Sequence, residues 1–336
     1  GDRHHWFDCM MNPDMNKRIT PEEYDKCSSL FISEYGYIGA PPKETVVAWL
    51  DGAPFDRQGQ VWQHHNNTFE KNTVDAGIRK HYADPESISL DDYFLYSGLT
   101  QGLMYAYSLE SFRARPDCHG GLFWMYADCW GEVGWTIVDY YLRRKPAWYF
   151  VRRALAPARL ILREKKGVIT VTLANDTRAT LKGALEYGAL SLDGRQRDTQ
   201  RARFTALPLT RTVVATFARG AGDPSQQVWM ARASRLNAAE VEILPATLRA
   251  TDVRCLELPA PTLALAVSKA GPGMWTARVT SDVFAHAVHF TLPEGAVPED
   301  NYFDLLPGET REVTITSPRA LKSSRVGVTS VLPQTC

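Results

Sequence analysis

Short apolar runs alternate with helical patterns over the first 150 residues of the chain. The runs at 30–33 and 121–126 are apolar and are flanked by turn or cap residues, which predicts two buried strands. Between them, a helical pattern opens at Ser89 and continues to about Arg115, where Pro116 stops it. Strands that alternate with helices predict parallel α/β architecture, in which functional side chains gather at the carboxyl ends of the strands.

Two further helices are predicted on either side of this core. Thr20-Pro21-Glu22-Glu23 combines a capping box with proline at the first helical position. The basic run 143–153 interleaves arginine and lysine with Trp148, Tyr149 and Phe150. Such a pattern predicts a helix that packs its aromatic face inward and keeps its basic side chains in water, rather than a nucleic-acid surface.

The pattern changes after Arg153, where apolar and polar residues alternate in short segments. The segments 168–173 and 212–217 are of this kind, and Gly, Asp, Asn and Pro turns separate such segments. Period-two alternation between turns predicts the strands of β-sandwiches. A break near 236–239 divides the region into two pieces of roughly 80–100 residues, the size of an immunoglobulin-like sandwich. We therefore predict three domains, at residues 1–154, 155–237 and 238–336.

Composition and charge limit the kind of partner. Lysine plus arginine and aspartate plus glutamate both total 38, so no net charge attracts nucleic acid or an anionic membrane. No apolar run reaches the roughly eighteen residues that a membrane span needs. The six cysteines form no C-x-x-C pair, so neither a zinc ribbon nor a thioredoxin motif is present. We expect neither nucleic acid nor membrane as a partner, and a neutral substrate.

One carboxylate directly follows a predicted strand. Ser33-Glu34-Tyr35-Gly36 places Glu34 where its side chain would project into a cleft. A strand-end glutamate paired with a neighbouring arginine is the alternative for this tetrapeptide. Trp124 takes the matching position on the second strand, and Trp130 and Trp135 follow it. Aromatic faces stack on sugar rings while carboxylates bind the hydroxyls, although tryptophan is also a common core residue.

The connection after the first strand offers further candidates for substrate binding. His65 and Asn66 lie in the segment 62–67, at the edge of the sheet where loops commonly bind substrate. A solvent-facing loop is an equally good interpretation. The histidines of the first 65 residues, with Cys9, show no spacing for tetrahedral metal ligation, so we expect no metal and no cofactor.

Four sequence blocks resemble a known family. They are 31–37 (FISEYGY), 121–130 (GLFWMYADCW), 137–141 (IVDYY) and 300–309 (DNYFDLLPGE), and they span nearly the whole chain. Together they resemble the β-mannosidases of glycoside hydrolase family 2. The opening Gly1-Asp2-Arg3-His4-His5-Trp6 also resembles the family's Gly-Asp-x-His-x-Trp segment.

This resemblance implies a fold and a mechanism. The fold is the carboxy-terminal part of a (β/α)₈ TIM barrel followed by two immunoglobulin-like β-sandwich domains. Glu34, at the end of the seventh barrel strand, would be the nucleophile of a retaining exo-glycosidase that removes terminal β-D-mannose from an oligosaccharide. Trp124, at the eighth strand, would form the floor of the sugar site, and Trp6 would also bind substrate.

The resemblance also implies that one group is missing. A retaining glycosidase uses a second carboxylate about 5–5.5 Å from the nucleophile. In the family this acid/base is a glutamate that follows asparagine, and no Asn-Glu pair occurs in these 336 residues. We expect the missing amino-terminal part of the same enzyme to supply the acid/base and to be a partner of this chain. The chain alone is expected to be inactive.

Two alternatives stay open. Within the same family, glucosaminidase, galactosidase and glucuronidase activities use the same nucleophile position. A non-catalytic carbohydrate-binding fragment is the alternative from another class, because it would keep the aromatic floor and the sandwiches without hydrolysis.

Overall fold

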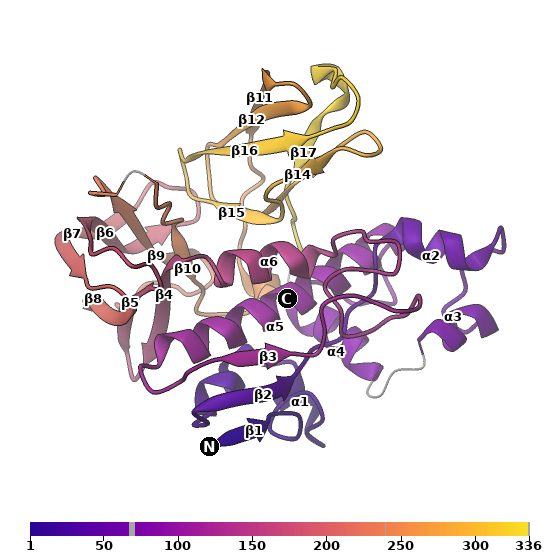
Figure 1. Ribbon diagram of the computed structural model, residues 1–336, viewed down its shortest axis with the longest axis horizontal. Helices are drawn as coiled ribbons and strands as arrows, with labels where there is room; N and C mark the ends of the chain where they lie inside the picture. Colours follow the sequence, from indigo (N-terminus) through magenta and orange to yellow (C-terminus); the bar gives the residue numbers. More distant parts are fainter. Residues whose placement is uncertain (67–70, 239, 335–336) are drawn as a thin grey trace.

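The computed structural model, which describes residues 1–66, 71–238 and 240–334, begins with a three-stranded sheet (Figure 1). Its order is β1 (Asp2–His4), β2 (Phe31–Tyr35) and β3 (Gly121–Phe123). Both pairings are parallel, which confirms the two predicted strands and their direction. The sequence analysis did not predict β1, because its three residues are polar and exposed and form no apolar run.

Six α-helices lie in the described part of the chain. They are α1 (Met15–Arg18), α2 (Lys43–Leu50), α3 (Gln60–His65), α4 (Asn72–His81), α5 (Leu90–Ala114) and α6 (Pro146–Ala154). α5 confirms the predicted long helix, because the Ser89 hydroxyl accepts the Asp92 N–H at 3.1 Å and the helix ends before Pro116. Among the described residues, no helix combines the length and the apolar character needed to cross a membrane.

Two glycines allow α5 and α6 to pack closely (Figure 1). A Cβ atom on Gly98 would lie 2.6 Å from Pro146 Cγ, and one on Gly102 would lie 2.5 Å from Phe150 Cδ2. Residues four apart lie on the same face of a helix, so both positions face α6. Any larger residue there would force the two helices apart.

The predicted helix near residue 20 takes a different form. Pro21–Lys26 is a 3₁₀ helix (η1), and the Thr20 side chain makes no cap. The capping-box prediction is therefore wrong. Glu23, which should reach back to Thr20, instead accepts hydrogen bonds from Lys26 Nζ at 2.6 and 2.7 Å.

The basic run forms the predicted helix, but not all of its basic side chains lie in water. α6 buries Tyr149, but Lys145, the residue just before the helix, is completely buried as well. Lys145 Nζ donates to Gly39 O at 2.7 Å and to Gly134 O at 3.3 Å. Desolvation by burial lowers the pKa of Lys145 to about 8. Carbonyl oxygens thus replace water around an ammonium group that was expected in solvent.

The first β-sandwich consists of two antiparallel sheets. One has the order β4 (Ala158–Lys165), β5 (Val168–Asn175) and β8 (Thr210–Ala218); the other has the order β10 (Ala246–Leu248), β9 (Gln227–Ser234), β6 (Leu181–Ser191) and β7 (Arg197–Ala206). The predicted strands at 168–173 and 212–217 are confirmed as parts of β5 and β8. Apolar side chains from both sheets, among them Val171 and Trp229, form one buried core.

The second β-sandwich is built in the same way. One sheet has the order β11 (Leu263–Gly271), β12 (Met274–Ser281), β16 (Thr310–Thr316) and β14 (Val297–Pro298); the other has β15 (Phe303–Leu305), β13 (Ala285–Thr291) and β17 (Gly327–Thr329). Two short 3₁₀ helices, η2 (Val253–Cys255) and η3 (Ser323–Arg325), lie outside these sheets.

The division into three domains stays a prediction, and one of its boundaries needs adjustment. β10 lies beyond the predicted boundary at 237/238, yet it pairs with β9 of the first sandwich. Ala246 belongs to the core of that sandwich. We therefore propose a second boundary after Leu248, which keeps the sheet whole.

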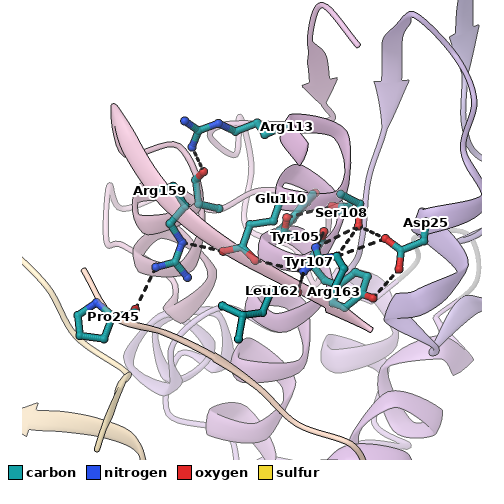
Figure 2. A network of polar contacts seen from close by, with 12 residues as sticks. Asp25, Tyr105, Tyr107, Ser108, Glu110, Arg113, Arg159, Leu162, Arg163 and Pro245 are labelled. Carbon is teal, nitrogen blue, oxygen red and sulfur yellow. Dashed lines mark hydrogen bonds and ion pairs between the residues drawn. The ribbon is translucent and has the colours of Figure 1, made fainter. Parts of the chain in front are cut away.

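Charged side chains join the first sandwich to α5. Figure 2 shows Arg159 of β4 donating from Nε to Glu110 of α5 at 2.8 Å. Arg163 of the same strand lies 3.3 Å from a carboxylate oxygen of Asp25 in η1. These contacts attach β4 to two helical elements of the amino-terminal part.

A buried arginine joins α6 to the second sandwich. Arg153 donates to the Asp300 carboxylate, to Asn301 O at 2.8 Å and to Tyr302 O at 2.9 Å. Arg311 binds the other oxygen of Asp300, whose side chain is only 5% exposed. One carboxylate between two guanidinium groups therefore holds this junction.

Replacing Arg153 by methionine should lower the free energy of unfolding by about 3 kcal/mol, because it leaves buried acceptors without their donor. Chemical unfolding measures the loss. Arg195→Met is the matched control, since Arg195 forms an exposed ion pair with Asp193, and it should cost less than about 1 kcal/mol. Equal losses in the two variants would contradict the importance of this junction.

Lys145→Met should remove one specific pH dependence. The folded chain releases the Lys145 proton near pH 8, whereas an unfolded lysine holds it to about pH 10.5. The unfolded state thus binds more protons between these values, and the free energy of unfolding should rise with pH by about 3 kcal/mol. Urea unfolding at several pH values should show this rise in the unmodified protein and in the exposed control Lys269→Met. An unchanged rise in Lys145→Met would refute the assignment.

Candidate active site

Glu34 lies near the carboxyl end of β2 with its side chain 29% exposed. Trp6 Nε1 donates to Glu34 Oε1 at 2.7 Å, and His4 Nδ1 lies 3.8 Å from the same oxygen. The Glu34 carbonyl accepts the His5 N–H at 2.7 Å. Among the described residues its ion-pair partner is a histidine, not the arginine of the alternative interpretation. The carboxylate is thus oriented by an indole and remains partly open to solvent.

Trp124 follows β3 immediately, on the strand that neighbours β2. Its N–H donates to Tyr35 O at 2.6 Å, so the backbone of Trp124 lies against the residue after Glu34. Its side chain is 46% exposed, which leaves part of the indole available for contact. The peptide bond between Trp124 and Met125 is cis.

Gly36 marks the place where Trp6 and Trp124 meet. A Cβ atom on Gly36 would lie 2.6 Å from Trp124 O and 2.7 Å from Trp6 Cη2. Trp6 is only 8% exposed and packs edge-on against Trp135, with ring centroids 5.0 Å apart. The structure therefore brings Glu34, Trp6 and Trp124 into one group. In that group Trp6 has little free surface, and its clearest contact is with the carboxylate.

His65 and Asn66 belong to a second group. The His65 ring lies between the indoles of Trp49 and Trp130, with centroids 4.3 and 4.7 Å away and interplanar angles of 7° and 14°. Its Nδ1 is hydrogen-bonded to Gly131 O. Asn66 is buried. Both faces of the imidazole are covered, so sugar binding by His65 or Asn66 stays a prediction that only their polar edges could fulfil.

A half-buried carboxyl group lies further along the loop that carries Trp124. Asp128 is half-buried, and desolvation raises its pKa to about 6, while the positive charge of Lys145 opposes that rise. The charges of Asp128, Glu132 and Asp139 in turn oppose the lowering of the Lys145 pKa. The charges of Asp128 and Lys145 thus each offset part of the desolvation of the other.

Three residues of this region escaped the sequence analysis as partners of Glu34 or of its loops: His4, Lys145 and Tyr105. His4 stands two residues before Trp6 in the opening block, and that proximity was the only available signal. Lys145 and Tyr105 bind backbone carbonyl groups of other segments, between 11 and 106 residues away, so nothing in their local pattern marks them.

A cavity of about 470 Å³ lies elsewhere, between α5, α6 and the two sandwiches. Arg159, Arg249 and Asp304 are among its lining residues, whereas Glu34 and Trp124 are not. Arginines and carboxylates in this wall are paired with one another. The cavity belongs to the domain junction and not to the Glu34 group.

Comparisons with known proteins agree with this arrangement. The family model Ig_mannosidase, an Ig-fold domain, matches residues 258–331. Beta-mannosidase B of Aspergillus terreus is 23% identical over 354 aligned residues, which cover 95% of this chain and 40% of that protein. Beta-mannosidase B of Thermothelomyces thermophilus is 31% identical over 152 residues, covering 40% of this chain and 17% of that protein.

Solved structures extend the similarity to the fold. The β-D-mannosidase of Dictyoglomus thermophilum superposes with a TM-score of 0.88 at 25% identity, covering 98% of this chain and 40% of that one. The exo-chitosanase CsxA of Amycolatopsis orientalis shares the fold at 15% identity, with a TM-score of 0.67 over 93% of this chain and 44% of that one. The chain spans about two fifths of the length of the relatives it matches over most of its own length. The chain is therefore similar to the carboxy-terminal part of the β-mannosidases of glycoside hydrolase family 2.

Proposed function

We propose that this chain carries the nucleophile half of the active site of a retaining exo-glycosidase that releases terminal β-D-mannose. The observation that carries the proposal is the Glu34 carboxylate, which Trp6 Nε1 holds at 2.7 Å beside the half-exposed Trp124. The names of the relatives support the choice of mannose.

The reaction divides into two displacements. Glu34 attacks the anomeric carbon and forms a glycosyl ester, while a second carboxylic acid protonates the leaving oxygen. The second group then removes a proton from water, which cleaves the ester and restores Glu34. Trp6 donates a hydrogen bond to one oxygen of this carboxylate, so it fixes the direction of the nucleophile.

The second carboxylate, we propose, comes from residues outside this chain that complete a (β/α)₈ barrel. β1 and β3 form the two edges of the parallel sheet and pair with no further strand among the described residues. Phe7 is 75% exposed and Leu122 on β3 is 58% exposed. Open parallel edges and exposed apolar residues are what additional barrel strands would cover. The greater length of the relatives supports the same proposal.

Replacing Glu34 by glutamine, in the protein that contains both parts of the barrel, should lower turnover on the order of 10⁴-fold or more. A 2-deoxy-2-fluoro-mannosyl fluoride should label the unmodified protein on the peptide that contains Glu34, as mass spectrometry would show. Exposed Glu44→Gln is the control and should keep both turnover and labelling.

A second variant tests the stereochemistry. With Glu34→Ala, azide should enter the vacated space and form the α-mannosyl azide, since it attacks from the side of the nucleophile. Retained turnover in Glu34→Gln, or a label on another carboxylate, would refute the assignment of Glu34.

The substrate is tested with a set of aryl β-glycosides. We expect kcat/KM for the β-mannoside to exceed that for the β-glucosaminide, β-galactoside and β-glucuronide by at least about 10²-fold. Faster cleavage of another sugar would assign the chain to that activity within the family. Binding of manno-oligosaccharides without any turnover would favour the non-catalytic alternative.

A further inference from the structure

We propose that Tyr105 is a positioning residue of the Glu34 site, whose hydroxyl group fixes the segments that follow β2 and β3 relative to each other. This inference rests on the proposed function. It concerns a residue in the interior of α5 whose hydroxyl group, among the described residues, bonds to backbone groups and not to Glu34 itself.

The Tyr105 hydroxyl meets three backbone groups from two loops. It lies 2.7 Å from Trp135 O and 3.0 Å from Trp124 O, and it accepts the N–H of Tyr37 at 3.1 Å. A phenol has one proton, so the two carbonyl oxygens share it while the oxygen lone pair receives the amide. Tyr105 is completely buried, and burial raises the pKa of its hydroxyl far above the usual value, so the donor proton stays in place.

Each of these backbone groups leads to the proposed site. Tyr37 stands three residues after Glu34, on the segment that continues from β2. Trp124 carries a partly exposed indole, and its backbone N–H donates to Tyr35, the residue after Glu34. Trp135 packs edge-on against Trp6, whose indole N–H holds Glu34. One hydroxyl therefore connects the backbone beyond the nucleophile, the aromatic floor and the support of the residue that orients the nucleophile.

A second side chain of α5 reinforces the same connection. Gln101 lies one turn before Tyr105, and its Nε2 is 2.9 Å from Tyr37 O and 3.2 Å from both Gly134 O and Thr136 O. Residues four apart share one face of a helix, so this face of α5 forms hydrogen bonds with both loops. Gly39 N also donates to Gly134 O at 3.0 Å, which closes the contact between the loops directly.

Tyr105→Phe would keep the ring and remove all three contacts. The two strand ends could then shift by fractions of an ångström, and misplacement on the order of 1 Å is enough to lower a rate about 10²-fold. We expect kcat to fall between about tenfold and 10²-fold with KM changed less than about threefold, because the sugar still meets the same side chains. The rate of labelling by the fluoro sugar should fall in parallel.

Tyr107→Phe is the matched control. Tyr107 lies on the same helix, and its hydroxyl donates to Asp25 at 2.7 Å on the side that faces η1 (Figure 2). Both variants lose a hydroxyl group and its hydrogen bonding, so both should lower the Tm. With assays run well below both melting temperatures, only Tyr105→Phe should lower kcat. Equal kcat values for the two variants would overturn the inference.

Two further measurements keep the test decisive. If Tyr105→Phe fails to fold, Gln101→Met replaces it, and a kcat within twofold of the unmodified protein would count against the inference. Glu34→Gln, prepared and assayed in the same way, separates the hypothesis that Glu34 is the nucleophile from the hypothesis that Tyr105 positions the site. Should Glu34→Gln retain turnover, the proposed function fails; should it be inactive while Tyr105→Phe keeps full kcat, only the role of Tyr105 fails.

Discussion

Several polar side chains of α5 find hydrogen-bond partners inside the protein, and each such pairing matters because an unpaired buried polar group costs about 1–3 kcal/mol. Gln101 and Tyr105 find them in the loops after β2 and β3, and Ser108 donates to the Tyr35 hydroxyl at 3.1 Å. Glu110 finds its partner in β4. These hydrogen bonds hold α5 against both the parallel sheet and the first sandwich, so the helix sets the position of one relative to the other.

The candidate site follows from this arrangement. Two neighbouring parallel strands end at the same edge of the sheet, and each delivers one candidate side chain there, Glu34 or Trp124. Trp6 enters from the segment after β1 and supplies the hydrogen bond that neither strand provides. The chemistry is local, whereas the positions of its parts depend on side chains of a distant helix.

The features that the sequence predicted well have local causes. The apolar runs of β2 and β3 and the serine cap of α5 are written within a few residues, and the structure contains all three. The amphipathic pattern of its helix predicted Lys145 in water. The structure instead buries its ammonium group against two backbone carbonyls, those of Gly39, more than a hundred residues earlier, and Gly134, eleven residues earlier.

The candidate site shows the same division. Its residue types could be named from the blocks that contain Glu34, Trp6 and Trp124. Two features could not be predicted: the direction of the Trp6 N–H toward a carboxylate 28 residues away, and the stacking of His65 between two indoles. Each depends on tertiary contacts that no local pattern encodes.

The two glycines of α5 give the molecule a sensitive point. Gly98 and Gly102 set the separation between α5 and α6, and Arg153 at the end of α6 holds Asp300 of the second sandwich. A methyl group added to either glycine would push α6 away from α5. Because Arg153 belongs to α6, this shift would also move the contact with Asp300. The orientation of the second sandwich thus depends on two glycines whose lack of a side chain leaves room for α6, and a larger residue at either position would change the angle between the domains as well as the local packing.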